Sequence, residues 1–327
     1  MCPAVTTSVS SGTRYIADLF CVLKLAFINI FVTKVRVGGM FTFEEIFGGE
    51  LSFSIQQSLL LSLDTLSVIR LGRTCKVFWS VCANEWKVEK LFDRYGIKFE
   101  EFRVKMREYS AVISGGLILQ FLDREVWEES DMDVYVKRGS KAKAIRLYIV
   151  EQCGYELCPK GDNPESWTVG IQSVVSYVKT VKGRKRCVQV MSTMCAPEDC
   201  VLRGFDRTAV MNIATADRIY GLFPRTTFVD RNMVVLREWS AGAGRKEKYE
   251  ARGWTSVGWK LEEELQQARR IGDSMCWVMK LNDTKYVFGE HEEDSRRECK
   301  RFAVGKHGCV ILRQNEVECG RKRKRDV

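Results

Sequence analysis

Two aspartates stand one residue apart in the segment "SDMDVYV", which runs from Ser130 to Val136. The segment alternates polar and apolar residues as a half-buried strand does, so we expect Asp131 and Asp133 to project from the same face. Two like charges at that distance repel each other, and each loses hydration unless a cation compensates. Carboxylate oxygens are ligands that Mg²⁺ prefers in proteins. The pair is therefore a candidate metal site.

A glycine pair precedes these aspartates in the chain. Gly115 and Gly116 follow the apolar segment "AVIS" and precede "LILQFL", a pattern that predicts a strand, a tight turn and a helix. Backbone N–H groups at such a turn can approach a phosphate closely, so Ser114, Gly115 and Gly116 are candidate ligands for a triphosphate. The basic turn of a predicted hairpin supplies further candidates for neutralising phosphate charge, namely Lys182, Arg184, Lys185 and Arg186.

The stretch from Ile113 to Val136 resembles the signature of the nucleotidyltransferase superfamily, as in its DNA polymerase beta-like members. That signature is Gly-Gly or Gly-Ser, a helix, and then two aspartates that alternate with apolar residues on a strand. The resemblance implies that Asp131 and Asp133 are catalytic and bind Mg²⁺, and that a nucleoside triphosphate is bound beside the glycines.

The family also requires a third carboxylate on a neighbouring strand. The predicted strand "CVQVMST" offers only Gln189, whose amide carries no negative charge and is no general base near neutral pH. Glu198 and Asp199 are predicted to lie in a loop, and Asp206 is predicted to cap a helix. We therefore expect Asp131, Asp133 and Gln189 to cluster in an incomplete site with little or no nucleotidyl transfer.

A simpler interpretation of the two aspartates stays open. Asp131 and Asp133 can cap the end of a strand and pair with Lys137, Arg138 or the basic turn 182–186.

The segment "LDTLSVIRLGRTCKVFWSVCANEW", from Leu63 to Trp86, resembles the second half of an F-box. Its apolar residues recur at helical spacing, and Asp64 is a predicted helix N-cap. The resemblance implies binding to the Skp1-type adaptor of a ubiquitin ligase through an apolar helix face. The residues that would contact the adaptor are Leu66, Ile69, Leu71, Cys75, Phe78 and Trp79. The alternative is an ordinary amphipathic helical pair that packs on its own core.

Together the segments resemble a group of fungal proteins with an F-box-like start and a nucleotidyltransferase-like body. Alternating strands and helices favour an α/β (α+β) fold. The expected parts are an N-terminal extension (1–39), an F-box-like helical unit (40–100), a nucleotidyltransferase-like domain (101–230), a C-terminal extension (231–315) and a basic tail (316–327). The function implied is an F-box-type adaptor or substrate receptor with a degenerate, inactive nucleotidyltransferase-like domain. The alternative is an active Mg²⁺-dependent nucleotidyltransferase.

Local patterns predict several further elements. Helices are expected over 51–95, 100–109, 204–223 and 259–272, with another helical piece over 245–254. A helix over 140–154 is expected to have Ser140 as its N-cap and to end at Gly154. A hairpin is expected over 171–193, and strands over 275–281 and 285–289.

The charge of the chain is concentrated at its end. The formal net charge is +10, and residues 300–327 carry nine Lys or Arg against three Asp or Glu. The run Arg321–Arg325 must be solvated or bound to an acidic partner, so it predicts nuclear import, with nucleic-acid binding through the tail as a further alternative. Residues 15–32 are apolar but contain Asp18 and Lys24, which disfavours a membrane anchor.

The cysteine spacing indicates free thiols. The chain has 13 cysteines, two histidines and no C-x-x-C pair, and its closest cysteine pairs are Cys153/Cys158 and Cys195/Cys200. Zinc sites need tighter pairs of ligands. We therefore interpret the cysteines as the reduced, small apolar residues of an intracellular protein.

Overall fold

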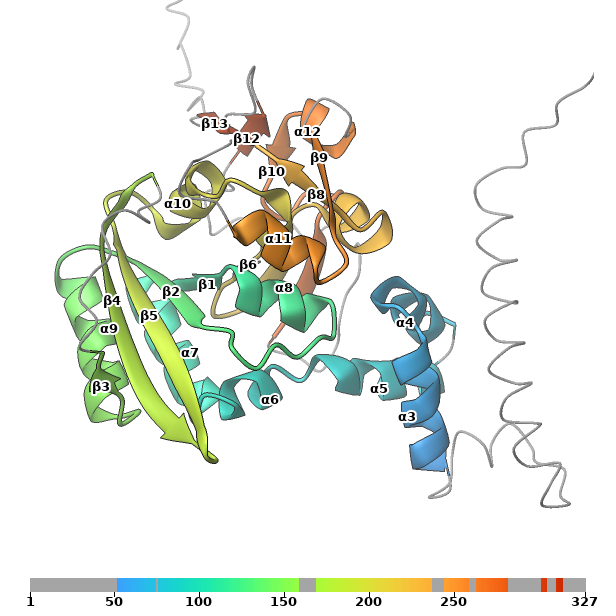
Figure 1. The fold of residues 1–327 in the computed structure, drawn as a ribbon, viewed down its shortest axis with the longest axis horizontal. Helices are drawn as coiled ribbons and strands as arrows, with labels where there is room; N and C mark the ends of the chain where they lie inside the picture. The colour runs from blue at the N-terminus through green and yellow to red at the C-terminus, as the bar shows by residue number, and fades with distance from the viewer. Residues whose placement is uncertain are drawn as a thin grey trace, which may run out of the picture. The chain divides into compact units, whose positions relative to one another are not determined.

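The computed structural model describes residues 52–74, 76–158, 169–236, 244–258, 263–281, 301–304 and 310–313. They form a mixed α+β fold, as the sequence predicts (Figure 1). The chain divides into two compact units, with the boundary between Trp86 and Lys87. This boundary lies earlier than the predicted limit at residue 100, and the residues that follow Trp86 belong to the second unit. Within the described ranges, no helix is long and apolar enough to cross a membrane, and the apolar stretch 15–32 lies outside them.

The first unit is helical, as predicted. Its elements are α3 (Ser52–Ser62), α4 (Thr65–Gly72), α5 (Lys76–Ala83) and the 3₁₀ turn η1 (Asn84–Trp86). The predicted N-cap is confirmed, because Asp64 accepts a 2.8 Å hydrogen bond from the Ser67 backbone N–H at the start of α4. At Gly72 an added Cβ would lie 3.2 Å from the Cβ of Cys82, so the glycine allows α4 and α5 to approach closely.

The second unit is built on an eight-stranded sheet in the order β11-β7-β6-β1-β2-β5-β4-β3. Only β2 and β5 pair in parallel; the other neighbours are antiparallel. The strands are β1 (Val112–Ser114), β2 (Met132–Lys137), β3 (Glu156–Leu157), β4 (Ile171–Val181), β5 (Arg184–Thr193), β6 (Ile213–Ala214), β7 (Arg218–Gly221) and β11 (Trp277–Lys280). The predicted hairpin over 171–193 and the predicted strand over 275–281 are thus confirmed.

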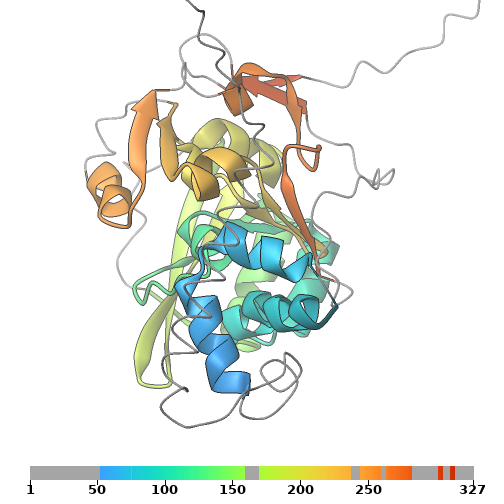
Figure 2. The same ribbon diagram turned by 90° about the vertical axis from the view of Figure 1, so that its right-hand side faces the viewer.

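Two smaller sheets come from the C-terminal part of the chain, drawn in orange to red in Figure 2. One pairs β8 with β9, and the other contains β10, β12 and β13. Their bounds are β8 (Asn232–Val235), β9 (Thr255–Gly258), β10 (Arg269–Arg270), β12 (Arg301–Val304) and β13 (Val310–Arg313). The predicted strand over 285–289 lies outside the described residues.

Helices of the second unit lie on both faces of the large sheet and beside the two smaller sheets. They are α6 (Val88–Asp93), α7 (Phe99–Tyr109), α8 (Gly116–Leu122), α9 (Ser140–Glu151), α10 (Pro197–Gly204), α11 (Arg245–Glu250) and α12 (Glu263–Gln266). On one face, Arg146 of α9 donates hydrogen bonds to the hydroxyls of Ser173 and Ser192. On the other face, Tyr135 of β2 packs in a core cluster with Cys200 and Val201 of α10.

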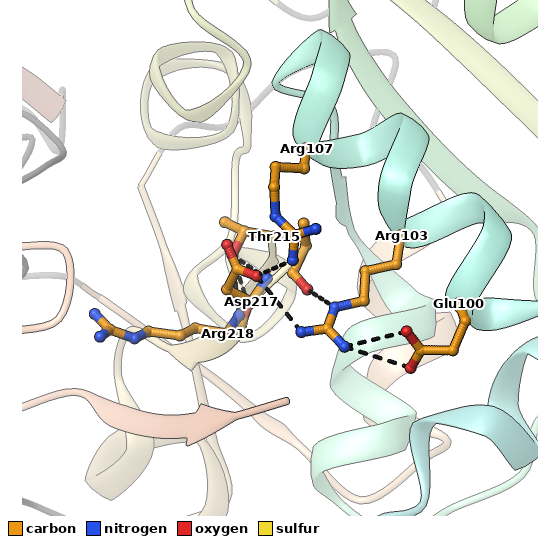
Figure 3. A network of polar contacts seen from close by, with 7 residues as sticks. Glu100, Arg103, Arg107, Thr215, Asp217 and Arg218 are labelled. Atoms are coloured by element: carbon orange, nitrogen blue, oxygen red, sulfur yellow. Dashed lines mark hydrogen bonds and ion pairs between the residues drawn. The ribbon is translucent and has the colours of Figure 1, made fainter. Parts of the chain in front are cut away.

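Helix α7 is fastened to the turn between β6 and β7 by the polar network in Figure 3. Arg103 donates a 2.7 Å hydrogen bond to the Ala216 carbonyl and lies 3.6 Å from Asp217. Arg107 donates a 2.5 Å hydrogen bond to the same carboxylate. Asp217 thus accepts a hydrogen bond from Arg107 and forms an ion pair with Arg103, one turn earlier in α7, which ties the helix to a turn more than a hundred residues further along the chain.

Three sequence predictions about these elements are wrong. Residues 204–223 are not one helix but contain a short 3₁₀ turn (η3, Thr208–Val210) and the strands β6 and β7, because these segments are buried by tertiary packing and have no exposed helical face. Gly139, not Ser140, is the N-cap of α9. Within the described part of the helix expected over 259–272, only α12 is helical. The chain then forms the short strand β10.

Candidate functional site

The paired aspartates lie at the centre of the large sheet. Asp133 is on β2 and faces Ser114 of antiparallel β1 on one side and Gln189 of parallel β5 on the other. Asp131 lies just before the strand, and the Gln189 side-chain amide donates a 3.3 Å hydrogen bond to its carboxylate. The predicted clustering of Asp131, Asp133 and Gln189 is therefore confirmed.

The glycine turn lies directly against this cluster. Gly115 has a φ of +83°, and a Cβ added there would lie 2.8 Å from Oδ2 of Asp133, so only glycine fits. Its backbone N–H donates a 3.3 Å hydrogen bond to the Val210 carbonyl. Ser114 is fully buried, and its hydroxyl donates to the Asn212 carbonyl at 2.5 Å. Ser114 therefore supports the turn from inside the fold, and Gly115 is the turn residue whose backbone lies against the Asp133 carboxylate.

The loop between α8 and β2 is held in place by side chains from two elements. Gln120 of α8 accepts a 2.8 Å hydrogen bond from the Trp127 backbone N–H. Arg94 donates to the Trp127 carbonyl at 3.2 Å, and the Tyr95 hydroxyl donates to the Ser130 carbonyl at 2.6 Å. These bonds fix the chain immediately before Asp131, so the long gap between the glycines and the aspartates is an ordered connection.

The surroundings shift the pKa values of the two aspartates to different extents. Burial, followed by the charge of Asp131, raises the pKa of Asp133 to about 8, and Lys248 opposes that rise. Desolvation also raises the pKa of Asp131, although hydrogen bonding by Cys187 and the charge of Lys248 oppose it. Near neutral pH the raised pKa therefore favours the protonated form of Asp133, and the negative charge of the pair lies mainly on Asp131.

The other acidic candidates do not complete the site. Glu198 and Asp199 lie in the first turn of α10 and not in a loop as predicted, since Pro197 at the first helical position starts the helix before them. Asp206 is buried and does not cap a helix as predicted; it lies 3.4 Å from Arg207. Within the described ranges, no cluster of three or more His, Cys, Asp or Glu side chains is placed to hold a metal ion.

Two arginines of the basic turn are paired with Glu128, an acidic residue outside the aspartate pair. Arg184 forms an ion pair with Glu128, and Arg186 donates to both the Glu128 carbonyl at 2.6 Å and its carboxylate at 3.1 Å. Lys182, at the tip of the turn, and Lys185 are exposed. The cations that the sequence suggested for neutralising a phosphate, or for pairing with the aspartates, are thus partly committed to the loop before β2.

Residues from α11 complete the surroundings of the pair, and no motif indicated them. Lys248 is the cation whose charge acts on both aspartates. A Cβ added at Gly116 would lie 3.1 Å from the hydroxyl of Tyr249, so this buried side chain occupies the space beside the glycine turn. Tyr249 also packs edge to face with Trp127 and Trp254, at centroid distances of 6.2 and 6.4 Å. Nothing in the spacing of these residues could link them to a site more than a hundred positions away.

The predicted adaptor-binding residues are unequally exposed. Leu71 is 1% exposed, and Ile69 and Phe78 are also buried. Leu66 and Trp79 are half-buried, while Cys75 lies outside the described residues. Only part of the predicted surface is therefore available as a contact face in the described structure.

In sequence comparisons, neither a protein-family model nor a curated protein matches this chain.

Proposed function

We propose that the chain is an adaptor or substrate receptor in which a nucleotidyltransferase-like domain has become a binding module. The proposal rests on the position of Gln189 in the sheet. It stands directly beside Asp133 in the parallel register, where the family signature calls for a carboxylate, and its amide is hydrogen-bonded to Asp131. Two carboxylates and an amide supply too little negative charge for a pair of divalent ions.

Two further features support loss of the transfer reaction. The raised pKa of Asp133 means that a metal would first have to displace a proton near neutral pH. The hydroxyl of Tyr249 lies beside Gly116, where the family resemblance would place phosphate groups. The donor set still fits one loosely held Mg²⁺ through Asp131 and Asp133, with the positive charge compensating the pair.

The second candidate function is active Mg²⁺-dependent nucleotidyl transfer. It is favoured by the close contact between Gly115 and Asp133, which keeps the glycine turn and the carboxylates together. In that case Gly115 and Gly116 would hold the triphosphate, and Asp131 and Asp133 would bind the metal. Lys182 and Lys185 are the exposed lysines of the basic turn, and Lys248 is the cation whose charge acts on both carboxylates. Calorimetry with each nucleoside triphosphate and Mg²⁺ tests binding apart from turnover. Binding that is lost in Asp131→Asn supports a retained ligand site.

Binding to a Skp1-type adaptor is tested by a pull-down with purified proteins. Leu71→Asp is a poor probe, because a charge at a site with 1% exposure is expected to unfold the helical unit. Leu66→Asp places the charge at a half-buried position, and Ser80→Asp is the matched control at an exposed position of α5. We expect the parent protein and Ser80→Asp to retain the adaptor and Leu66→Asp to lose it. Failure of the parent protein to bind would leave an ordinary helical pair.

Nuclear residence is proposed from Arg321–Arg325, which lies outside the described residues. A fluorescent fusion of the whole chain is compared with one truncated after Gly320. We expect nuclear accumulation only in the first, because the removed run supplies the cationic segment. Equal distribution of both fusions would contradict import. Loss of nucleic-acid binding on the same truncation, at unchanged distribution, would favour the alternative role of the tail in nucleic-acid association.

A further inference from the structure

Two cysteines meet at the beginning of α10. Ala196 is the N-cap and Pro197 the first helical residue, so Cys195 precedes the cap and Cys200 is the fourth residue of the helix. Side chains at these two positions commonly touch and fix the angle at which the chain enters a helix. Here both are thiols, and their sulfur atoms lie 3.1 Å apart.

The backbone around the pair holds the sulfurs together. A Cβ added at Gly170, whose φ is +88°, would lie 2.9 Å from the sulfur of Cys200 and 3.2 Å from that of Cys195. The thiol of Cys200 donates to the Gly170 carbonyl at 3.4 Å, and the Met194 backbone N–H donates to the same oxygen at 2.8 Å. The strand end and the helix start are thus both fixed to Gly170, and neither thiol can move far from the other.

We propose that Cys195 and Cys200 are a redox modification site, at which a peroxide oxidises the two thiols to a reversible disulfide. The bond length of a disulfide is about 2 Å, so the sulfurs need to approach by only about 1 Å. The start of α10 already supplies the chain geometry, and no element has to unfold.

The reaction has two steps. The Cys195 thiolate attacks one oxygen of hydrogen peroxide, the O–O bond breaks, and the leaving hydroxide takes a proton to become water, which leaves a sulfenic acid on Cys195. The sulfur of Cys200 then attacks the sulfur of Cys195 and gives up its proton, the S–O bond breaks, the departing hydroxide takes that proton and leaves as a second water, and the S–S bond forms. The two thiols lose two electrons and two protons, and the peroxide is reduced to two waters. A low-molecular-weight thiol reverses the change by exchange.

The order of attack follows from the surroundings of the two thiols. Cys195 is half-buried and open to a small oxidant, whereas Cys200 is 1% exposed. Burial, followed by the hydrogen bond to Cys195, raises the pKa of Cys200 to about 12, which keeps it protonated and unreactive towards an oxidant in solution. Cys195 is therefore the attacking thiol and Cys200 the resolving one.

The pair lies close to the candidate site. Cys200 packs in the core cluster with Tyr135, and Tyr135 is two residues from Asp133 on the same strand, so both side chains lie on one face of the sheet. The strand that carries Gln189 runs directly into Cys195 through Thr193, whose hydroxyl donates to the Cys195 carbonyl at 2.8 Å. A disulfide at this point would tie the end of β5 to α10 on the face of the sheet that holds the carboxylates.

Cys187 is an internal control for the test, because it lies on the same tryptic peptide as the pair. Cleavage after Arg186 and Arg203 gives one tryptic peptide that holds Cys195, Cys200 and also Cys187, a half-buried thiol of β5. The folded protein is treated with hydrogen peroxide, then unfolded in N-ethylmaleimide, digested and analysed by tandem mass spectrometry. We expect a peptide with maleimide on Cys187 alone and a mass lower by two hydrogens at Cys195 and Cys200. Treatment with dithiothreitol before the maleimide should restore all three additions.

Two variants distinguish disulfide formation between Cys195 and Cys200 from nonspecific oxidation of thiols. In Cys195→Ser, Cys200 should stay reduced and take the maleimide after peroxide treatment, and Cys187→Ser should leave the 195–200 bond unaffected. Maleimide on all three cysteines of the oxidised parent protein would overturn the proposal. So would a disulfide that uses Cys187, or a sulfinic acid on Cys195 with free Cys200.

Discussion

Replacing Asp133 with asparagine should stabilise the protein, and the gain should grow with pH. The asparagine side chain has the shape of the protonated carboxyl group but cannot ionise. In the folded protein, burial and the charge of Asp131 raise the pKa of Asp133 from 3.8 to about 8. Between these values the folded state binds a proton that the unfolded chain does not, so the stability of the parent protein falls as pH rises through this range.

The size of the effect follows from the shift. Each unit of pKa difference corresponds to about 1.4 kcal/mol, so the full shift from 3.8 to about 8 is worth on the order of 6 kcal/mol. Asp133 keeps some surface exposure, and water screens part of this, so we expect about half, or roughly 2–3 kcal/mol, at pH values above about 8. Well below pH 3.8 the Asp133 carboxyl group is protonated in both the folded and the unfolded state, and the variant and the parent protein should be equally stable.

The assay is chemical unfolding from about pH 4.5 to about pH 8.5, with a chelator present so that no divalent ion binds the pair. Asp93→Asn, at an exposed position of α6, controls for the general effect of removing a carboxylate. The stability difference between Asp133→Asn and the parent protein should rise with pH, while that of the control stays nearly constant. A destabilised Asp133→Asn at pH 8, or a difference independent of pH, would refute the account of this carboxyl group.

Other substitutions test the elements around the site. Gly115→Ala should cost about 2–3 kcal/mol in unfolding experiments, because the backbone has a positive φ and the new Cβ would meet Asp133 at 2.8 Å; a neutral result would contradict this. Asp123→Ala should lower stability by about 2 kcal/mol, because it removes the carboxylate whose two oxygens accept from one guanidinium nitrogen of Arg231 at 2.7 and 2.8 Å; unchanged urea midpoints would argue against it. Asp217→Ala should cost only about 1 kcal/mol because that network is partly exposed, and a larger loss that persists in high salt would contradict a surface role.

The sequence predicts the centre of the fold better than its connections. The strand and turn around Gly115, the strand with Asp133 and the hairpin with Gln189 follow from local alternation and glycine chemistry, and their meeting follows from the family resemblance. The helix predicted over 204–223 is wrong, because most of this segment is buried and its pattern of residues does not distinguish short strands from a helix.

The surroundings of the site depend on contacts that are distant in sequence. The sequence leaves Arg184 and Arg186 free to meet a phosphate, but in the structure Glu128, in the loop before β2, pairs with both. Lys248 and Tyr249 come from a helix that lies beyond the domain expected to hold the site. Tertiary packing decides such partners, and neither residue carries a local pattern that could have pointed to the aspartates.

We propose that Gln189 leaves the aspartate site without the metal chemistry of nucleotidyl transfer. The most direct test of this claim is an incorporation assay with labelled nucleoside triphosphates and Mg²⁺, in which the parent protein is compared with Asp131→Asn/Asp133→Asn. We predict no incorporation by the parent protein above the level of this double variant. Robust turnover by the parent protein that disappears in the double variant would contradict the claim and make this chain an enzyme.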